Sequence, residues 1–359
     1  MLDGIDPFGL KEKFDYFNFW RDEVETLARD ARFLRVVRRA IMPIPGLDPG
    51  RELDTNVFPP LKVEPHPVLA GKRVALCGSG GSASLVTLCG IKRALEEAEV
   101  DLCAVSLCSG SAIWGSLIAA GFDAQQMVDT CFDWTASDLV DFDWSAVADL
   151  ARKLGKGFVG LSRGVAIERA IERAVGPMAL GETPIPCWAI VLNLDTNELE
   201  FFGPHHHGEA SLARVVRTAV ALPLFVQPVR FGKHHYVDGG TVNIFPLEPL
   251  LELDPPVDYV IGVNAIMPPG FSGENIEGFE QTHTAIFRAS RQLYHVQWLE
   301  MARRVVQQAG DKLILLEPLP YSEITGSKFF EIFLDNSTWP AHVRTAYEDT
   351  KRRLAQITA

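Results

Sequence analysis

The sequence lacks several features that would each indicate a distinct class of protein. Its six cysteines include no C-x-x-C pair, which argues against a structural zinc site and favours reduced, buried thiols. No apolar run reaches the ~18 to 20 residues of a membrane span, because the longest, Thr218 to Val229, is interrupted by Pro223 and Pro228. The N-terminus has neither the basic nor the apolar region of a signal peptide. Together these absences predict a cytoplasmic protein.

Positive charge is also scarce, since 34 Lys and Arg face 46 Asp and Glu for a formal net charge of −12. This balance argues against nucleic acid as the main partner and against attachment to an anionic membrane by charge alone. The seven Trp and 21 Phe leave apolar contact with lipid surfaces open, and self-association is open as well. The length of 359 residues suffices for one large α/β domain or two ordinary ones.

Two regions differ in pattern. Residues 10–42 carry apolar side chains at helical spacing, and residues 43–70 are rich in proline without periodicity. We therefore divide the chain into an N-terminal helical segment with an extended connector, 1–70, and a catalytic domain with C-terminal helices, 71–359.

Strands and helices alternate through residues 72–316, which predicts an α/β fold with a mostly parallel central sheet covered by helices on both faces. The expected strands are Lys72 to Cys77, Val100 to Leu107, Pro186 to Leu194, Glu198 to Phe202, Tyr259 to Ala265 and Lys312 to Leu316. The main expected helices are 83–97, the run that ends at Ala120, 209–221, 279–308 and 340–357.

A serine elbow follows the second expected strand. Ser109, next to Gly110, lies where a β-prone run ends and a run of small and apolar residues suited to a helix begins. Acyl-transfer enzymes often place a nucleophile at such a turn, because the turn exposes the hydroxyl. Ser111, two residues further on, is an alternative nucleophile, and an ordinary strand-to-helix turn is the non-catalytic alternative.

A glycine loop follows the first expected strand, with Gly78, Gly80, Gly81 and Ser82 leading into a helix. Backbone N–H groups at a helix N-terminus suit a phosphate or an oxyanion. A dinucleotide site would need a third glycine and an acidic residue after the second strand, and both are missing. We therefore predict no nucleotide and no other cofactor.

Two further motifs lie downstream. Asp238-Gly239-Gly240 follows a short β-prone run and by itself indicates only a hairpin or loop turn. His205-His206-His207 suggests a metal site, but adjacent histidines are expected to point in different directions, and no acidic residue lies at ligand spacing. The sequence therefore predicts a solvated loop and no metal.

The order of glycine loop, serine elbow and Asp-Gly-Gly resembles the patatin-like phospholipase family and the related cytosolic phospholipases over about residues 72–265. Cys108-Ser109-Gly110-Ser111 is similar to the Leu-Ser-Gly-Ser of the cytosolic phospholipases. The sequence departs from the family in lacking the flanking glycines of Gly-X-Ser-X-Gly, and in having Ser82 where Arg or Lys commonly follows the oxyanion glycines. The resemblance implies a three-layer fold and a lipid acyl hydrolase with Ser109 as nucleophile and Asp238 as catalytic aspartate.

The chemistry expected of these residues is acyl-ester hydrolysis. Asp238 would take the proton of Ser109 directly, and the N–H groups of Gly80, Gly81 and Ser82 would hold the oxyanion. Gly78, Gly110, Gly239 and Gly240 would support the turns. The substrate would be a lipid or another acyl ester, and transfer to an acceptor other than water uses the same residues.

Two alternatives stay open on the sequence. One is a Ser–His–Asp esterase, and the other is a non-catalytic lipid-binding protein on a degenerate hydrolase fold. The histidines that could serve as the base of the first are His234, His235, His283, His295 and His342.

Overall fold

The structure is a computed structural model that describes residues 53–143, 145, 159–272, 285–324 and 327–358. The helices expected within residues 10–42 lie outside these residues. Residues 53–65, in the proline-rich stretch, form neither helix nor strand. The division of the chain at residue 70 stays a prediction.

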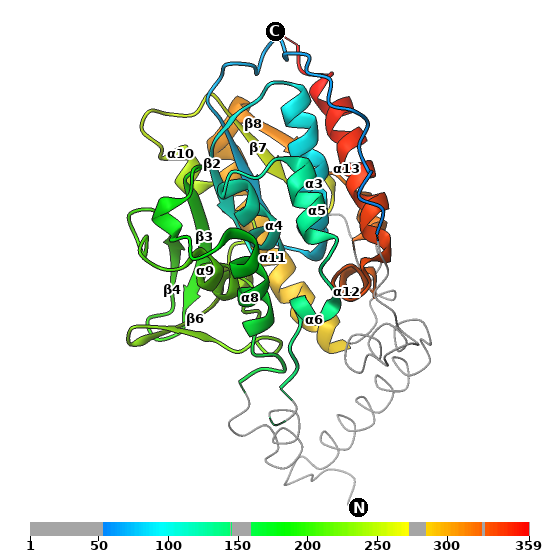
Figure 1. The fold of residues 1–359 in the computed structure, drawn as a ribbon. Coiled ribbons are helices and arrows are strands. Elements are labelled where there is room, and N and C mark those ends of the chain that lie inside the picture. The colour runs from blue at the N-terminus through cyan, green and yellow to red at the C-terminus, as the bar shows by residue number, and fades with distance from the viewer. Residues whose placement is uncertain (1–52, 144, 146–158, 273–284, 325–326, 359) are drawn as a thin grey trace, which may run out of the picture.

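A single eight-stranded sheet forms the centre of the fold (Figure 1). Its strands run in the order β5-β6-β3-β2-β1-β7-β8, and β4 pairs with β3. Pairing is parallel from β3 through β2, β1 and β7 to β8, and antiparallel where β4, β5 and β6 join. The mostly parallel α/β sheet is therefore confirmed. The strands are β1 (Val74–Gly78), β2 (Leu102–Leu107), β3 (Cys187–Asn193), β4 (Glu198–Phe202), β5 (Val229–Phe231), β6 (His234–Asp238), β7 (Tyr259–Val263) and β8 (Leu313–Leu316).

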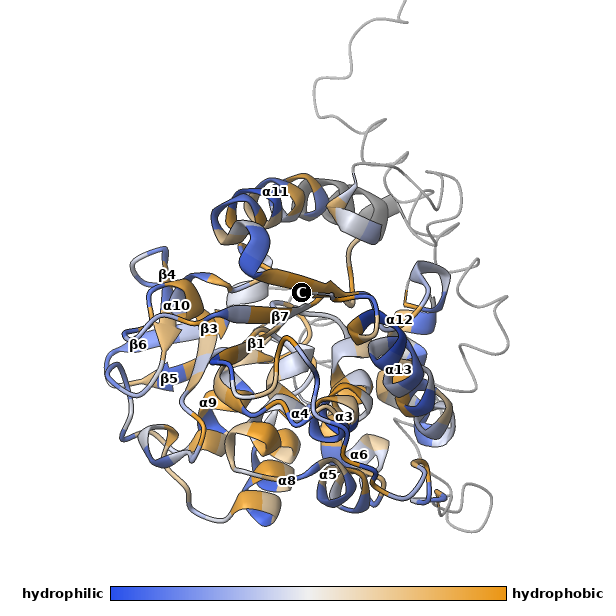
Figure 2. Ribbon diagram, turned by 90° about the horizontal axis from the view of Figure 1, so that it is seen from above, coloured by the Kyte–Doolittle hydropathy of each residue, from blue (hydrophilic) through white to orange (hydrophobic). Residues whose placement is uncertain are grey.

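Helices cover both faces of the sheet, which gives three layers (Figure 2). Every residue of β1 is buried, and alternate residues enter different clusters. Val74 and Leu76 join the larger core, whereas Ala75 and Cys77 join the core that Leu299 also enters. The larger core lies under α3 (Ser82–Glu97), α4 (Gly110–Ala119), α5 (Ala124–Cys131), α8 (Val165–Val175), α9 (Leu212–Ala219) and α13 (Trp339–Leu354); the smaller core lies under α10 (Glu248–Leu251) and α11 (Ala285–Ala309).

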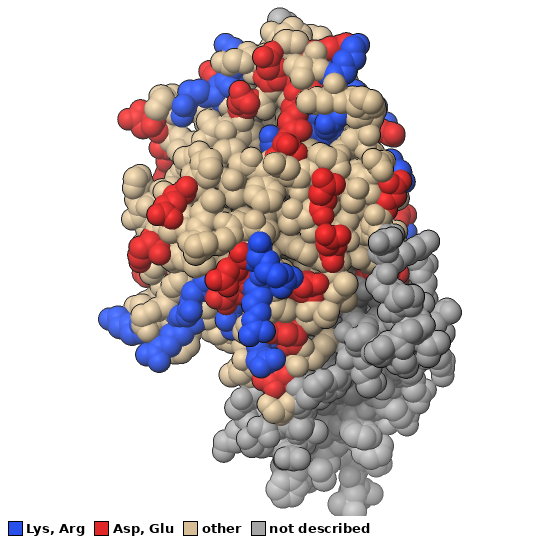
Figure 3. Space-filling model, in the orientation of Figure 1, with Lys and Arg blue, Asp and Glu red and all other residues tan. Residues whose placement is uncertain are grey.

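Two short helices, α6 (Ala136–Leu139) and α12 (Ser327–Leu334), also contribute to the larger core, through Leu139 and Ile332. None of the helices in the described residues is both long enough and apolar enough to cross a bilayer. On the face shown in Figure 3, acidic side chains are scattered and basic ones gather mainly below the centre and near the top, with a broad uncharged area between. That distribution agrees with the charge balance, which gave no reason to expect a nucleic-acid surface.

The sheet topology brings the two candidate loops together. β1 and β2 are parallel neighbours whose last residues, Gly78 and Leu107, are paired. The carboxyl ends of both strands therefore lie at one edge, where the next residues begin the glycine loop and the serine elbow. The N–H of Cys108 donates to the carbonyl of Gly78 at 3.2 Å, which continues the pairing into the loops.

Candidate active site

Ser109 occupies a strained turn between β2 and α4. Its φ is 50° and its ψ is −122°, a conformation that side-chain-bearing residues rarely adopt. The turn is tolerated because its neighbours are small: a Cβ on Gly110 would lie 2.1 Å from the carbonyl oxygen of Gly81. A Cβ on Gly80 would lie 3.3 Å from the Cβ of Ser109. The glycine loop therefore packs directly against the elbow, and Ser109 stays half-buried.

Ser111 holds the elbow rather than facing the site. Its side chain is fully buried, its hydroxyl accepts from the N–H of Cys108 at 2.9 Å, and it donates to the carbonyl of Gly78 at 2.8 Å. These bonds join the ends of β1 and β2. The thiol of the neighbouring Cys108 is also buried, and burial raises its pKa well above the ordinary value, so it is a poor thiolate.

Asp238 lies at the end of β6, where it is 1% exposed. Its Oδ1 accepts from the N–H of Gly240 at 2.8 Å, and the Ser109 side chain lies near enough to the carboxylate for hydrogen bonding to lower its pKa. Burial raises the pKa of Asp238 to about 7, although both hydrogen bonds act in the opposite direction. A carboxylate with this pKa can accept a proton near neutral pH.

Gly239 and Gly240 allow the segment after Asp238 to pack closely against β3 and the serine elbow. A Cβ on Gly239 would lie 2.7 Å from the backbone of Ile190, and one on Gly240 would lie 2.7 Å from the sulfur of Cys108. The Asp-Gly-Gly motif thus begins at the end of the antiparallel hairpin formed by β5 and β6. In the pairing of β6 with β3, Asp238 lies opposite Val191. Pattern alone predicted the turn but not the pairing with β3.

The three predicted oxyanion donors differ in their surroundings. The N–H of Gly80 donates to the carbonyl of Ile244 at 3.0 Å. It is therefore not free to hold an oxyanion, contrary to the expectation from the sequence. Gly81 and Ser82 lie at the N-terminus of α3, where N–H groups have no carbonyl partner within the helix. The hydroxyl of Ser82 is buried and has no hydrogen-bond partner among the residues that the structure describes. Sequence patterns gave no signal for this free hydroxyl.

The histidines considered as bases have other contacts. His235 pairs with Asp195 at 3.2 Å, and His234 lies 3.9 Å from the same carboxylate. His342 lies on α13 near the charges of Glu323 and Lys328. His295 lies on α11, and His283 falls outside the described residues. No histidine is among the groups that shift the pKa of Asp238, as far as the described residues show.

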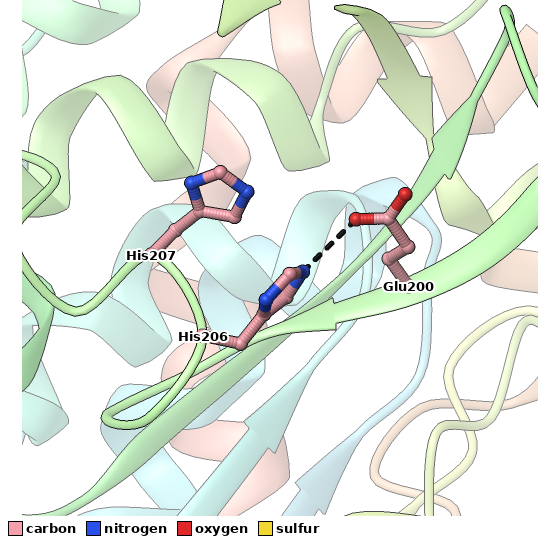
Figure 4. A group of neighbouring side chains, drawn as sticks. All are labelled: Glu200, His206 and His207. Carbon is pink, nitrogen blue, oxygen red and sulfur yellow. Dashed lines mark hydrogen bonds and ion pairs between the residues drawn. The ribbon is translucent and has the colours of Figure 1, made fainter. Parts of the chain in front are cut away.

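One expectation is wrong: His206 and His207 do have an acidic neighbour. Glu200, on β4, lies with its Oε2 3.0 Å from Nε2 of His206 (Figure 4). The carboxylate and the two imidazoles form one group, which local spacing in the sequence did not reveal.

Comparison with known proteins identifies a family that is similar to this part of the chain. A model of the patatin-like phospholipase family matches residues 76–251, which include the glycine loop, Ser109 and Asp238. Over these residues the chain is similar to the patatin-like phospholipase family. The family assignment made from the motifs is therefore confirmed.

Among patatin-like relatives, an NTE family protein of Mycobacterium tuberculosis is 26% identical over 202 residues, which are 54% of this chain and 49% of that protein. Lysophospholipase NTE1 of Cryptococcus neoformans is 26% identical over 236 residues, 66% of this chain and 13% of that protein. This chain thus spans about half the length of the mycobacterial relative and a smaller part of the fungal one.

Two solved structures are also similar to this chain. VipD from Legionella pneumophila aligns over 85% of this chain and 71% of its own, with 16% identity and a TM-score of 0.45. Human GIVD cytosolic phospholipase A2 aligns over 93% of this chain and 63% of its own, with 12% identity and a TM-score of 0.44.

Proposed function

We propose that this chain is a serine acyl hydrolase that cleaves ester bonds of lipids through an acyl-enzyme at Ser109. The proposal is carried by the position of Ser109 beside the buried carboxylate of Asp238, whose pKa the Ser109 side chain lowers. Similarity to the patatin-like phospholipase family over residues 76–251 supports the same chemistry.

Asp238 acts as the general base in this mechanism. It takes the proton of Ser109 as the hydroxyl oxygen attacks the acyl carbon, and it returns that proton to the leaving alcohol or lysolipid. Water then attacks the acyl-enzyme and gives a proton to Asp238, which returns it to Ser109 as the acid leaves. Neither step needs an imidazole, a metal or a cofactor.

The oxyanion is held at the start of α3. We assign the donors to the N–H groups of Gly81 and Ser82, which the helix leaves without carbonyl partners, and to the buried hydroxyl of Ser82. Gly80 contributes the space that lets the loop approach Ser109, because its own N–H is bonded to Ile244.

The substrate class is a lipid or related acyl ester. One relative is named a lysophospholipase, which favours a phospholipid or lysophospholipid. Contact with lipid surfaces, self-association and a cytoplasmic location stay predictions. All six cysteines are unpaired, as expected of a reducing compartment.

The decisive experiment is intact-mass labelling with a fluorophosphonate together with hydrolysis of a p-nitrophenyl ester. We expect one adduct per wild-type chain, lost in Ser109→Ala and kept in Ser111→Ala, which serves as the matched control two residues away. Asp238→Asn is expected to lower turnover by at least about 10²-fold, the low end of what loss of a general base costs.

Three results would contradict the mechanism. An adduct that follows Ser111 would move the nucleophile. Loss of turnover in His234→Ala or His342→Ala would indicate an imidazole base. A folded wild-type chain with neither adduct nor turnover would favour a lipid-binding protein.

A further inference from the structure

A second group of reactive side chains lies on the edge of the molecule built from β4, β5 and β6. It consists of Glu200, His206 and His207, whose ligand atoms all lie within 4.8 Å of one another. The three side chains surround a common space, one from β4 and two from the turn that follows it (Figure 4). They line a cleft of about 710 Å³ that is open to solvent.

The backbone explains why two adjacent histidines can face the same space. Gly203 and His206 exchange backbone hydrogen bonds of 2.8 and 3.0 Å, which close a tight turn after β4. His207 then has a φ of 62°, in the left-handed region that non-glycine residues rarely adopt. This reversal brings the imidazoles together, with ring centroids 4.5 Å apart. Backbone strain of this kind is found at ligand clamps.

Neighbouring side chains hold the three groups in place. Glu200 accepts from Asn193 at 2.8 Å through Oε1, and from the hydroxyl of Tyr236 at 3.3 Å through Oε2. The ring of His207 lies 4.2 Å from that of Phe202, centroid to centroid. Such outer contacts orient metal ligands in known sites.

We propose that Glu200, His206 and His207 bind one divalent transition-metal ion, of which Zn²⁺ is the best match. Two imidazoles and one carboxylate are a ligand set that suits zinc and its neighbours, whereas Ca²⁺ and Mg²⁺ prefer oxygen ligands alone. Ligands about 2 Å from an ion lie a little over 3 Å apart in a tetrahedron, and His206 and Glu200 already meet at 3.0 Å. The cleft that these side chains line is open to solvent and has room for a further ligand.

The site would lie beside the strands that lead to the proposed catalytic aspartate. Val191 of β3 is the register partner of both Glu200 and Asp238. Tyr236, which holds Glu200, is two residues from Asp238 on β6. A bound ion would hold β4 and the turn after it together beside β6. The proposal holds whether or not the chain is a hydrolase.

The test is titration of the metal-stripped full chain with Zn²⁺ by calorimetry, and with Co²⁺ followed by its visible absorption. We expect one ion per chain, with affinity lowered at least tenfold in Glu200→Gln, His206→Asn and His207→Asn. Tyr236→Phe is expected to weaken binding about tenfold, as loss of an outer contact does. Asparagine is chosen at position 207 because it tolerates a positive φ.

His205→Asn is the matched control, because His205 is an exposed histidine on the same turn outside the group. Unchanged binding in His205→Asn, with melting temperatures of all apo variants near that of the wild type, supports the site. Zn²⁺ should also raise the melting temperature of the wild type but not of Glu200→Gln. Equal weakening in His205→Asn, or binding unaffected by the three ligand variants, would overturn the proposal.

Discussion

At the scale of single residues, the properties of Asp238 follow from where it is buried. A carboxylate in water is a weak base, and removal from water is what raises its proton affinity. At 1% exposure Asp238 is removed from water, yet it retains bonds from Gly240 and Ser109 that keep its ionised form accessible. The resulting pKa of about 7 is matched to a base that works at neutral pH.

The first prediction concerns the pH dependence of turnover. Because Asp238 acts in its ionised form, kcat/KM should be level above pH 7 and fall about tenfold per pH unit below it. The measurement is p-nitrophenyl ester hydrolysis between pH 5 and 9. A profile that stays flat down to pH 5 would show that the base has an ordinary carboxylate pKa.

The same burial has a consequence for stability. The pKa of Asp238 is about 7 in the folded chain and near its ordinary 3.8 when unfolded, so the folded state binds the extra proton between these values. The contribution of Asp238 to the free energy of unfolding therefore falls as pH rises from about 4 to 7. Above pH 7 the ionised carboxylate lowers the free energy of unfolding by at most about 4 kcal/mol.

We therefore expect Asp238→Asn to be inactive but more stable than the wild type at pH 8, with the difference shrinking toward pH 5. Chemical denaturation at both pH values measures this. Asp195→Asn is the control, because hydrogen bonding to His235 lowers the pKa of that exposed carboxylate. Stabilisation by both variants would indicate a general charge effect instead.

At the scale of elements, the site depends on how closely the loops after β1 and β2 approach each other. Gly110 is the contact point, since its Cα faces the carbonyl oxygen of Gly81 at the start of α3. Backbone cannot move aside as a flexible side chain can. Geometry at the oxyanion site is therefore coupled to the size of the residue after Ser109.

Gly110→Ala should push the start of α3 away from the elbow. We expect a loss in kcat of about 10²-fold, comparable to removal of one oxyanion donor. Gly310→Ala is the control: its Cβ enters open space at a distant positive-φ turn, so it should reduce stability by about 1 kcal/mol and leave kcat unchanged. Equal activity of Gly110→Ala and the wild type would show that the loop tolerates displacement.

At the scale of the whole molecule, covering the sheet on both faces determines which side chains reagents can reach. Five of the six cysteines are buried, and Cys103, on β2, is half-buried. Burial raises the pKa of Cys187 to about 12, and raises those of Cys77, Cys89 and Cys131 well above the ordinary value.

Alkylation of the native chain with N-ethylmaleimide should accordingly add at most one group, at Cys103, and leave activity intact. Six groups should add in guanidinium chloride, since the sequence has six cysteines. Cys103→Ser is the control and should abolish the native adduct. Rapid labelling of Cys108 in the native chain would contradict the closed packing around the elbow.

The order of the elements and the identity of the motifs can be read from the sequence alone. Strand periodicity, the glycines before α3 and the elbow at Ser109 are local features, and they placed the parallel sheet and the adjacent loops correctly. Asp-Gly-Gly by itself indicated only a turn, and Asp238 could be named because the order of the three motifs resembles that of the patatin-like phospholipases.

The contacts between groups from distant segments depend on how the chain folds in three dimensions. The bonds of Ser111 to Gly78 and the bond of Gly80 to Ile244 join segments far apart in the chain, so their donors could not be assigned from spacing. The approach of Glu200 to the histidines follows from the turn that Gly203 and His206 close and from the positive φ of His207. A local pattern fixes the conformation of a segment, but contacts between segments depend on strand register and on single backbone angles, which the pattern does not encode.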